Sequence, residues 1–290
     1  MYFSIRNLMY PVLVLSIFFA SSCKSNDNEP VEKSSFITRV FDYKYAPGQH
    51  AALALPGSIQ YFTGDPGLHS GWVYLGGFGG YITAGFDHDI INREGFDFEV
   101  YALKGNGPEP AIVYVMKDEN GDGLPNETWY ELKGNQFGNS TRNFQITYFK
   151  PSGNSNIKWR DSKGMKGELQ SGFGTSVTSG WWWPYETSDS ITFSGTRLPD
   201  AYDNNSTDGA EYWVVPKDRF TWGYAENLFG TDYDATSGTN KLDISNAVDA
   251  SGNSVSLTSI RFIKVQTAVF QQAGWTNEVS AEVRGARALE

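Results

Sequence analysis

Short runs of β-branched and aromatic residues, separated by Gly- and Asn-rich turns, constrain this chain more than any other feature. Such side chains fit a pleated, half-buried surface, so each run favours a β-strand. The runs cover residues 36–43, 72–75, 81–86, 96–101, 111–116, 129–132, 143–149, 190–193, 212–215, 260–265 and 278–283. About a dozen short strands with turn signals between them are typical of a sandwich or jelly roll. The sequence therefore predicts an all-β fold, a single jelly-roll-like β-sandwich, with one helix-like stretch at residues 244–249.

Two long segments interrupt the predicted strands. Residues 151–189 and 199–238 are rich in Gly, Ser and Asn, yet they also carry many aromatic side chains. Loops of this length in a compact domain are usually either functional or disordered, and rigid aromatic rings argue against disorder. We expect long aromatic-rich loop insertions that cover one face or one end of the sandwich.

The N-terminus has the pattern of an export signal. Arg6 is followed by an apolar run at residues 11–20, which is shorter than the roughly 20 residues of a membrane-spanning helix. Two serines then precede Cys23, as at a bacterial lipoprotein cleavage site. The alternative is an ordinary signal followed by an accidental cysteine, but Cys23 is the only cysteine in the chain. We predict a signal peptide at residues 1–22, a lipid on Cys23, a flexible tether at residues 23–35 and a β-sandwich binding domain at residues 36–290.

Composition and charge narrow the function classes. Removing residues 1–22 from the 290-residue chain leaves 268 residues, of which 33 are acidic and 22 basic, so the formal net charge is −11. The basic residues form no long patch, which argues against nucleic acid as a partner. The three histidines match neither the H-E-x-x-H zinc pattern nor a G-x-S-x-G nucleophile turn. Zinc chemistry and Ser–His catalysis are therefore poorly supported.

An acidic loop lies between the predicted strands at 111–116 and 129–132. Oxygen-bearing side chains alternate along it and Gly123 follows them, which is the first half of a calcium-binding loop, D-x-[DN]-x-[DN]-G. The twelfth position is Trp129 rather than the Glu of an EF-hand, and strands rather than helices flank the loop. We predict structural Ca²⁺ here, the alternative being a hairpin turn without an ion. The predicted ligands are Asp118, Asn120, Asp122, the backbone carbonyl of Leu124, and Asn126.

A cluster of aromatic residues is the predicted ligand-binding surface. Three consecutive tryptophans are unusual on a soluble surface, and an indole ring offers a flat face to a sugar or a conjugated ring, together with one N–H donor. The alternative is that these rings fill the core of the sandwich. The predicted binding residues are Trp181, Trp182, Trp183, Tyr185, Trp213, Trp222 and Tyr224.

Paired carboxylates provide an enzymatic alternative. Glycoside hydrolysis needs two acids about 5–10 Å apart. Glu211 could pair with Glu226 or with Asp232, but 33 acidic residues guarantee chance pairs and the sequence gives no distances. The sequence favours a protein that is not an enzyme.

Three segments together resemble the family of "cell surface protein" lipoproteins of Bacteroidetes. They are residues 79–86, residues 95–101, and the Leu-Asp-Ile stretch at 242–249 that precedes an apolar strand. The resemblance implies an outer-membrane lipoprotein displayed at the cell surface, often beside a TonB-dependent transporter that imports scarce nutrients. It implies no catalytic residues.

The leading functional prediction is therefore capture of a nutrient ligand, a glycan or a corrinoid-type cofactor, for an outer-membrane uptake system. The protein would touch the membrane only through its lipid anchor. The alternatives from other classes are a glycoside-active enzyme and a structural or adhesive surface protein. Two carboxylates converging in a cleft would favour the enzyme, and a flat aromatic face without a pocket would favour adhesion.

Overall fold

The computed structural model describes residues 32–103, 108–171, 180–274 and 277–289. They belong almost entirely to one compact unit, Lys33–Glu290. The predicted signal peptide, Cys23 and most of the predicted tether lie outside the described residues. Within the described part of the chain, no helix is both long and apolar enough to cross a membrane.

A six-stranded antiparallel sheet forms one layer of the sandwich. Its strand order is β1-β3-β16-β5-β6-β15. These strands are β1 (Arg39–Lys44), β3 (Tyr81–Ile91), β16 (Ser259–Thr267), β5 (Ala111–Met116), β6 (Tyr130–Leu132) and β15 (Ala247–Val248). Strands β5 and β6 pair as a hairpin, with Tyr114 opposite Glu131. The acidic loop therefore joins two paired strands, as the sequence predicted.

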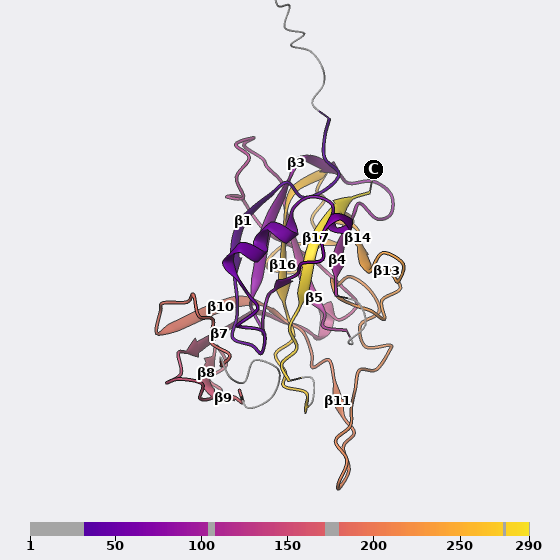
Figure 1. Ribbon diagram of the computed structural model, residues 1–290. Coiled ribbons are helices and arrows are strands. Elements are labelled where there is room, and N and C mark those ends of the chain that lie inside the picture. The colour runs from indigo at the N-terminus through magenta and orange to yellow at the C-terminus, as the bar shows by residue number, and fades with distance from the viewer. Residues whose placement is uncertain (1–31, 104–107, 172–179, 275–276, 290) are drawn as a thin grey trace, which may run out of the picture. The chain divides into compact units, whose positions relative to one another are not determined.

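A five-stranded antiparallel sheet forms the opposing layer (Figure 1). Its strands, in spatial order, are β13 (Tyr233–Asp234), β14 (Thr239–Leu242), β4 (Phe98–Ala102), β17 (Glu282–Ala288) and β2 (Val73–Tyr74). The main core lies between the two sheets, and both contribute to it: Ile82, Val113 and Val265 from the six-stranded sheet, Val100 and Val283 from the five-stranded sheet. The predicted all-β sandwich is confirmed.

Successive side chains of β5 point alternately to the inner and the outer face of the six-stranded sheet. Val113 and Val115 pack into the main core, whereas Ile112 and Tyr114 point to the outer face. Successive side chains of a strand point to opposite faces, so this apolar run is buried on both sides. The outer face of the sheet is thus also partly covered, and the covering segments shape the candidate site.

A four-stranded sheet was not predicted in full. Its order is β10-β7-β8-β9, with β10 (Ser190–Arg197), β7 (Thr141–Phe149), β8 (Ile157–Asp161) and β9 (Lys166–Leu169). Strands β8 and β9 lie inside residues 151–189, which the sequence analysis assigned to a loop. In β8, Ile157 is buried while Lys158 and Arg160 are exposed. The strand is short and mostly polar, and Gly and Asn residues flank it, so its sequence resembles that of a loop.

The remaining elements are short. A two-stranded ribbon, β11 (Asp203–Asn204) with β12 (Trp213–Val214), projects from the segment 199–238. The described part of the chain has four 3₁₀ turns: η1 (Pro56–Phe62), η2 (Pro66–Leu68), η3 (Phe137–Asn139) and η4 (Ile244–Asn246). The helix-like stretch predicted at 244–249 is η4 followed directly by β15.

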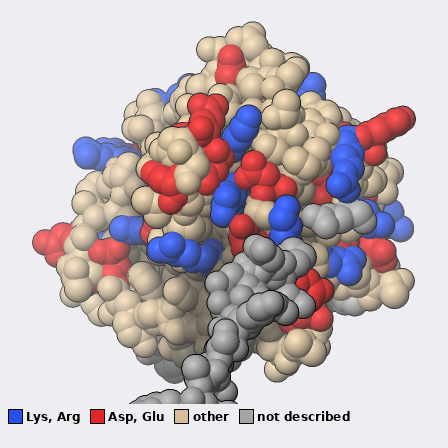
Figure 2. Space-filling model, turned by 90° about the horizontal axis from the view of Figure 1, so that it is seen from above, with Lys and Arg blue, Asp and Glu red and all other residues tan. Residues whose placement is uncertain are grey.

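The face seen from above mixes charges of both signs (Figure 2). Lysine and arginine side chains alternate there with aspartate and glutamate, and neither sign covers the face alone. A single-sign field of the kind that steers nucleic acid is not a feature of this face.

Candidate functional site

A cavity of about 440 Å³ lies on the outer face of the six-stranded sheet. The sheet forms its floor, strand β10 of the four-stranded sheet forms one wall, and the acidic loop forms another. Residues from all three parts line it, among them Tyr81, Thr83, Lys264, Thr192, Ser194 and Trp129. The cavity thus exists because the loop and the second sheet both stand above the same sheet face.

A second cavity of about 240 Å³ adjoins the first, and both are lined by Trp129, Ser194 and Lys264. Its other walls include Tyr114 and Arg142. We refer to the two adjoining cavities as the Lys264 cleft. Strand register explains the position of Lys264, because it pairs with Thr83 on one side and with Tyr114 on the other.

The Lys264 ammonium is surrounded by aromatic rings. Its Nζ lies 4.2 Å from the ring centroid of Tyr114, 5.7 Å from that of Trp129 and 5.9 Å from that of Tyr81. A cation over aromatic faces is stabilised by the ring quadrupoles. Burial lowers the pKa of Lys264 to about 8, against the opposing pull of Asp42 and Glu131. The ammonium is therefore still mostly protonated at pH 7.

The acidic residues of the cleft already accept hydrogen bonds from its walls. The Tyr81 hydroxyl donates to Asp42 at 2.6 Å, and the Thr196 hydroxyl donates to Glu131. Burial raises the pKa of the Glu131 carboxyl. Gln266 donates from its amide nitrogen to the Gly79 carbonyl at 2.8 Å. Its buried carbonyl oxygen Oε1 has no hydrogen-bond partner among the described residues.

The acidic loop gathers three carboxylates. Oxygen atoms of Asp118, Asp122 and Glu127 all lie within 4.8 Å of one another. The Asp118 side chain is only 2% exposed, and its Oδ1 has no hydrogen-bond partner among the described residues. Ca²⁺ binds oxygens at about 2.3–2.6 Å, so two oxygens on opposite sides of the ion lie roughly 5 Å apart. The spacing and the chemistry of this donor set fit a hard divalent cation.

The predicted ligands of the loop are arranged differently from the sequence expectation. Asn120 and Asn126 both direct their amide nitrogens at the Asp122 carboxylate, at 3.1 Å and 2.8 Å. The Leu124 carbonyl accepts a hydrogen bond from the Asn126 backbone N–H at 3.0 Å. Glu127 is at the tenth position of the loop, which is not a ligand position in the D-x-[DN]-x-[DN]-G calcium pattern, so the pattern did not predict it.

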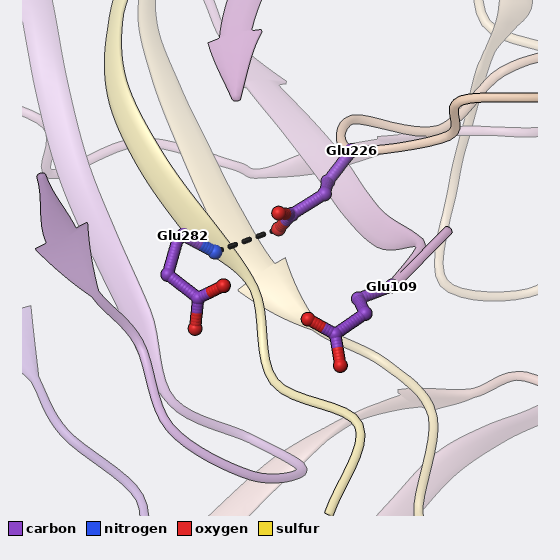
Figure 3. Close-up of side chains that lie close together, drawn as sticks. All are labelled: Glu109, Glu226 and Glu282. Carbon is purple, nitrogen blue, oxygen red and sulfur yellow. Dashed lines mark hydrogen bonds between the residues drawn. The ribbon is translucent and has the colours of Figure 1, made fainter. Parts of the chain in front are cut away.

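A second carboxylate cluster is also buried (Figure 3). Glu109 precedes β5, Glu226 follows a bridge between the chain segments at Ala111 and Ala225, and Glu282 begins β17. Oxygen atoms of the three glutamates lie within 4.8 Å of one another. Their exposed fractions are 8%, 2% and 3%. The Glu282 backbone N–H donates to Glu226 at 2.6 Å.

Burial raises the pKa of all three glutamates, and the neighbouring acids raise those of Glu109 and Glu226 further. The pKa of Glu282 reaches about 8. Three like charges cannot share so small a buried space, so protons or a bound cation must neutralise most of them. The sequence carries no signal for the burial of Glu282, because Glu278, Ser280 and Glu282 alternate with Val279, Ala281 and Val283, a pattern that predicts a solvent-facing polar side. Glu109 carries no such signal either.

Three of the predicted ligand-binding aromatics are buried, which corrects the sequence expectation of an exposed cluster. Trp181 and Trp182 are 0% and 8% exposed and pack against the four-stranded sheet. Tyr224 is 1% exposed and belongs to the cluster that packs against the outer face of the six-stranded sheet, together with Ile112. The small extra sheet needs a core of its own, and these large rings supply it. None of the three offers a face to a ligand in solvent.

The other four predicted aromatics lie in separate surroundings. Trp183 is half-buried and donates its indole N–H to the Ala54 carbonyl at 2.6 Å, with the exposed Tyr185 beside it. Trp213, the first residue of β12, donates its indole N–H to Glu211 at 3.1 Å. Trp222 lines a different cavity of about 200 Å³. They do not form one binding surface.

The acids proposed for hydrolysis are also dispersed. Glu211 is exposed on the β11–β12 ribbon, whereas Glu226 belongs to the buried cluster. Asp232 is buried and accepts a hydrogen bond from the Gly223 backbone N–H at 2.7 Å. Each acid has a different local role, and none of them lines the Lys264 cleft.

Fold and site together define an all-β sandwich with a lysine- and tryptophan-lined cleft on its outer face. Comparison with known proteins adds nothing to this description. No protein-family model matches the chain, and no curated protein matches it either.

Proposed function

We propose that the protein captures a small polyhydroxylated ligand, a glycan, in the Lys264 cleft. The observation that carries this proposal is the combination of aromatic rings and polar side chains, mostly hydroxyl groups, around one cavity of about 440 Å³. Ligand pockets are typically about 300–1,000 Å³, with mostly apolar walls and a few polar groups that set orientation. Trp129 provides a flat face for sugar C–H groups, and the hydroxyls of Thr83, Thr192 and Ser194 suit sugar hydroxyls.

The spacing of acids in the cleft favours binding over glycoside hydrolysis. Asp42 lies on β1 and Glu131 on β6, and the strands β3, β16 and β5 separate them. Four steps between neighbouring strands, each about 4.8 Å, amount to about 19 Å. A glycosidase needs its two acids about 5–10 Å apart. This pair is too widely spaced for that chemistry.

The proposal includes Ca²⁺ in the acidic loop. Glu127 lies two residues before Trp129, so an ion held by Asp118, Asp122 and Glu127 would fix the end of the loop that carries the cleft tryptophan. The unpartnered, buried oxygen of Asp118 supports this site. Stabilising the loop is the ion's role in this proposal.

The proposal also places the domain at the outer-membrane surface. The apolar run before Cys23 and the polar segment after it support a lipid anchor followed by a flexible tether. A captured glycan would pass to a TonB-dependent transporter. A corrinoid-type cofactor is the second ligand class to be screened.

The test is a glycan and corrinoid screen on the soluble domain, followed by titration calorimetry with two matched variants. Trp129→Ala removes the stacking ring of the cleft, and Trp222→Ala removes a ring from a different cavity. By analogy with stacked bases, one ring contributes about 1–3 kcal/mol, so Trp129→Ala should weaken binding roughly 5- to 150-fold. Trp222→Ala should bind like the wild type. If only Trp222→Ala weakens binding, or if neither variant does, the ligand does not bind in the Lys264 cleft.

A further inference from the structure

We infer that the ligand of the Lys264 cleft is an acidic saccharide, one that carries a carboxylate for Lys264 beside its hydroxyl groups. The inference rests on the proposed function and specifies the chemical class of the ligand. It is carried by groups in the cleft whose bonding capacity the described residues leave unused.

The first such group is the Lys264 ammonium. No hydrogen bond or ion pair within 4.0 Å joins its Nζ to another described residue. The nearest acids, Asp42 and Glu131, accept hydrogen bonds from Tyr81 and Thr196 instead. The ammonium is thus held among ring faces with its three donors free, at the junction of the two cavities. A ligand anion is the partner that such a cation favours.

The second group is the carbonyl oxygen of Gln266. This residue is 4% exposed and lines the larger cavity. Its amide nitrogen is already used, because it donates to two backbone carbonyls, those of Gly79 and Ser194. Those bonds fix the orientation of the amide and leave Oε1 as a buried acceptor without a donor. The oxygen itself has almost no accessible surface, so a sugar hydroxyl would contact it only if the Gln266 side chain turned toward the cavity.

The third group is Arg142, on the wall of the smaller cavity. One of its nitrogens, Nη2, donates to the Ser251 carbonyl at 3.0 Å, while Nη1 has no partner among the described residues and is enclosed beside Gly252, so Arg142 contributes to the cavity mainly through its charge. The Phe137 ring lies under its guanidinium at 4.9 Å. Each of the two adjoining cavities is therefore lined by a basic side chain. An oligosaccharide with an acid group on successive units matches this arrangement.

The charge of the cleft favours a carboxylate over a phosphate. Phosphate sites usually combine several cations with backbone N–H groups that converge on the anion. Here one ammonium lies among aromatic faces and one guanidinium lies in the adjoining cavity, and the side chains of Asp42, Glu131 and Asp249 also line the cleft. This mixture of charges suits a monoanion attached to a sugar ring better than a phosphate. Hydroxyls, a flat C–H face and one carboxylate per ring are the features of a uronic acid.

The experiment compares uronate oligosaccharides, such as fragments of pectin and alginate, with their methyl esters. Each ester keeps the sugar and removes the charge. For at least one of these saccharides, the wild-type protein should bind the acid at least tenfold more tightly than the ester, and added salt should narrow the difference. Lys264→Gln should weaken binding of that acid at least tenfold and leave ester binding within about threefold. Lys158→Gln, an exposed lysine on β8, serves as the matched control and should change neither.

Three results would overturn the inference: esters that bind as tightly as acids, equal losses for both ligands in Lys264→Gln, or no binding of any uronate. The acid-to-ester ratio of the wild-type protein needs no variant, so it decides the question even if Lys264→Gln does not fold. The proposed function is tested separately. If a neutral glycan binds and Trp129→Ala abolishes that binding, glycan capture in the cleft is supported and the acidic ligand class is rejected. If Trp129→Ala does not change binding of the ligand, both the proposed function and the acidic ligand class are rejected.

Discussion

At the scale of single residues, the aromatic segment 181–185 contains both a buried and an exposed ring, whose substitutions should affect stability differently. Trp181 is fully buried in the core of the four-stranded sheet, whereas Tyr185 is 52% exposed. Truncating a buried tryptophan removes many contacts and leaves a cavity, at a cost of about 3–5 kcal/mol. Trp181→Ala should therefore lower the free energy of unfolding by that amount in a urea titration. Tyr185→Ala should change it by less than about 0.5 kcal/mol. Equal effects of the two substitutions would contradict the burial of Trp181.

The buried glutamates predict a dependence of stability on pH. The folded pKa of Glu282 is about 8, above the ordinary value of 4.5. Between these two values the folded state keeps a proton that the unfolded state releases, so stability falls as pH rises. The loss is about 1.4 kcal/mol per pH unit for one such carboxyl.

The variant Glu282→Gln mimics the protonated acid and should remove part of this slope. Urea unfolding in EDTA at pH 5, 6, 7 and 8 measures it, with no cation present to replace the protons. The variant should match the wild type near pH 5 and exceed its stability at pH 8. Glu211→Gln, an exposed glutamate, is the control and should retain the wild-type slope. Parallel slopes for Glu282→Gln and the wild type would exclude a buried, protonated Glu282.

At the scale of elements, the acidic loop links an ion to the cleft. An ion that binds only the folded state stabilises it by about 2.7 kcal/mol at 100-fold excess over the dissociation constant. EDTA should therefore lower the melting temperature, and the double variant Asp118→Ala, Asp122→Ala should abolish that response. Glu127→Gln should weaken it, because Glu127 joins the cluster. A melting curve that EDTA does not change would leave a hairpin turn without an ion.

The elements also show where sequence reasoning succeeds. The hairpin β5–β6 was predicted almost to the residue, because its strands are apolar and its loop carries a strong turn pattern. Two strands of the four-stranded sheet, β7 and β10, were predicted, and the other two were missed. Strands β8 and β9 are short, exposed on one face and surrounded by Gly, Ser and Asn, so their local preference for β structure is weak. Tertiary packing onto β7 decides their conformation, and that pairing is invisible in the local sequence.

The candidate site shows the same limit. Lys264 lies in a segment that was correctly predicted as a strand, and Trp129 lies directly before β6, yet neither was proposed as a site residue. The cleft needs β16 to lie between β3 and β5, and β10 to stand above them. No periodicity within one segment contains that information. The signal that could have been used is a lysine inside the apolar run 260–265.

At the scale of the whole molecule, the lipid anchor is the main prediction. Cys23 lies outside the described residues, and the prediction depends on the sequence around it. Two acyl signals give stable membrane attachment, so Cys23→Ser should release the protein from the membrane fraction of cells. Immunoblotting of soluble and membrane fractions measures the distribution. The lipoprotein assignment fails if the variant remains with the membrane.

Strand β5 has a consequence for how the chain folds. Glu109 lies two residues before it, and Asp118 lies two residues after it, so each carboxylate cluster holds one end of a strand about 20 Å long. A slip of one residue would turn Tyr114 inward and Val115 outward, and it would pull both clusters apart together. Misaligned pairings are thus penalised at two distant points. We expect the two clusters, once protons or a cation neutralise them, to favour the native register of the β5–β6 hairpin.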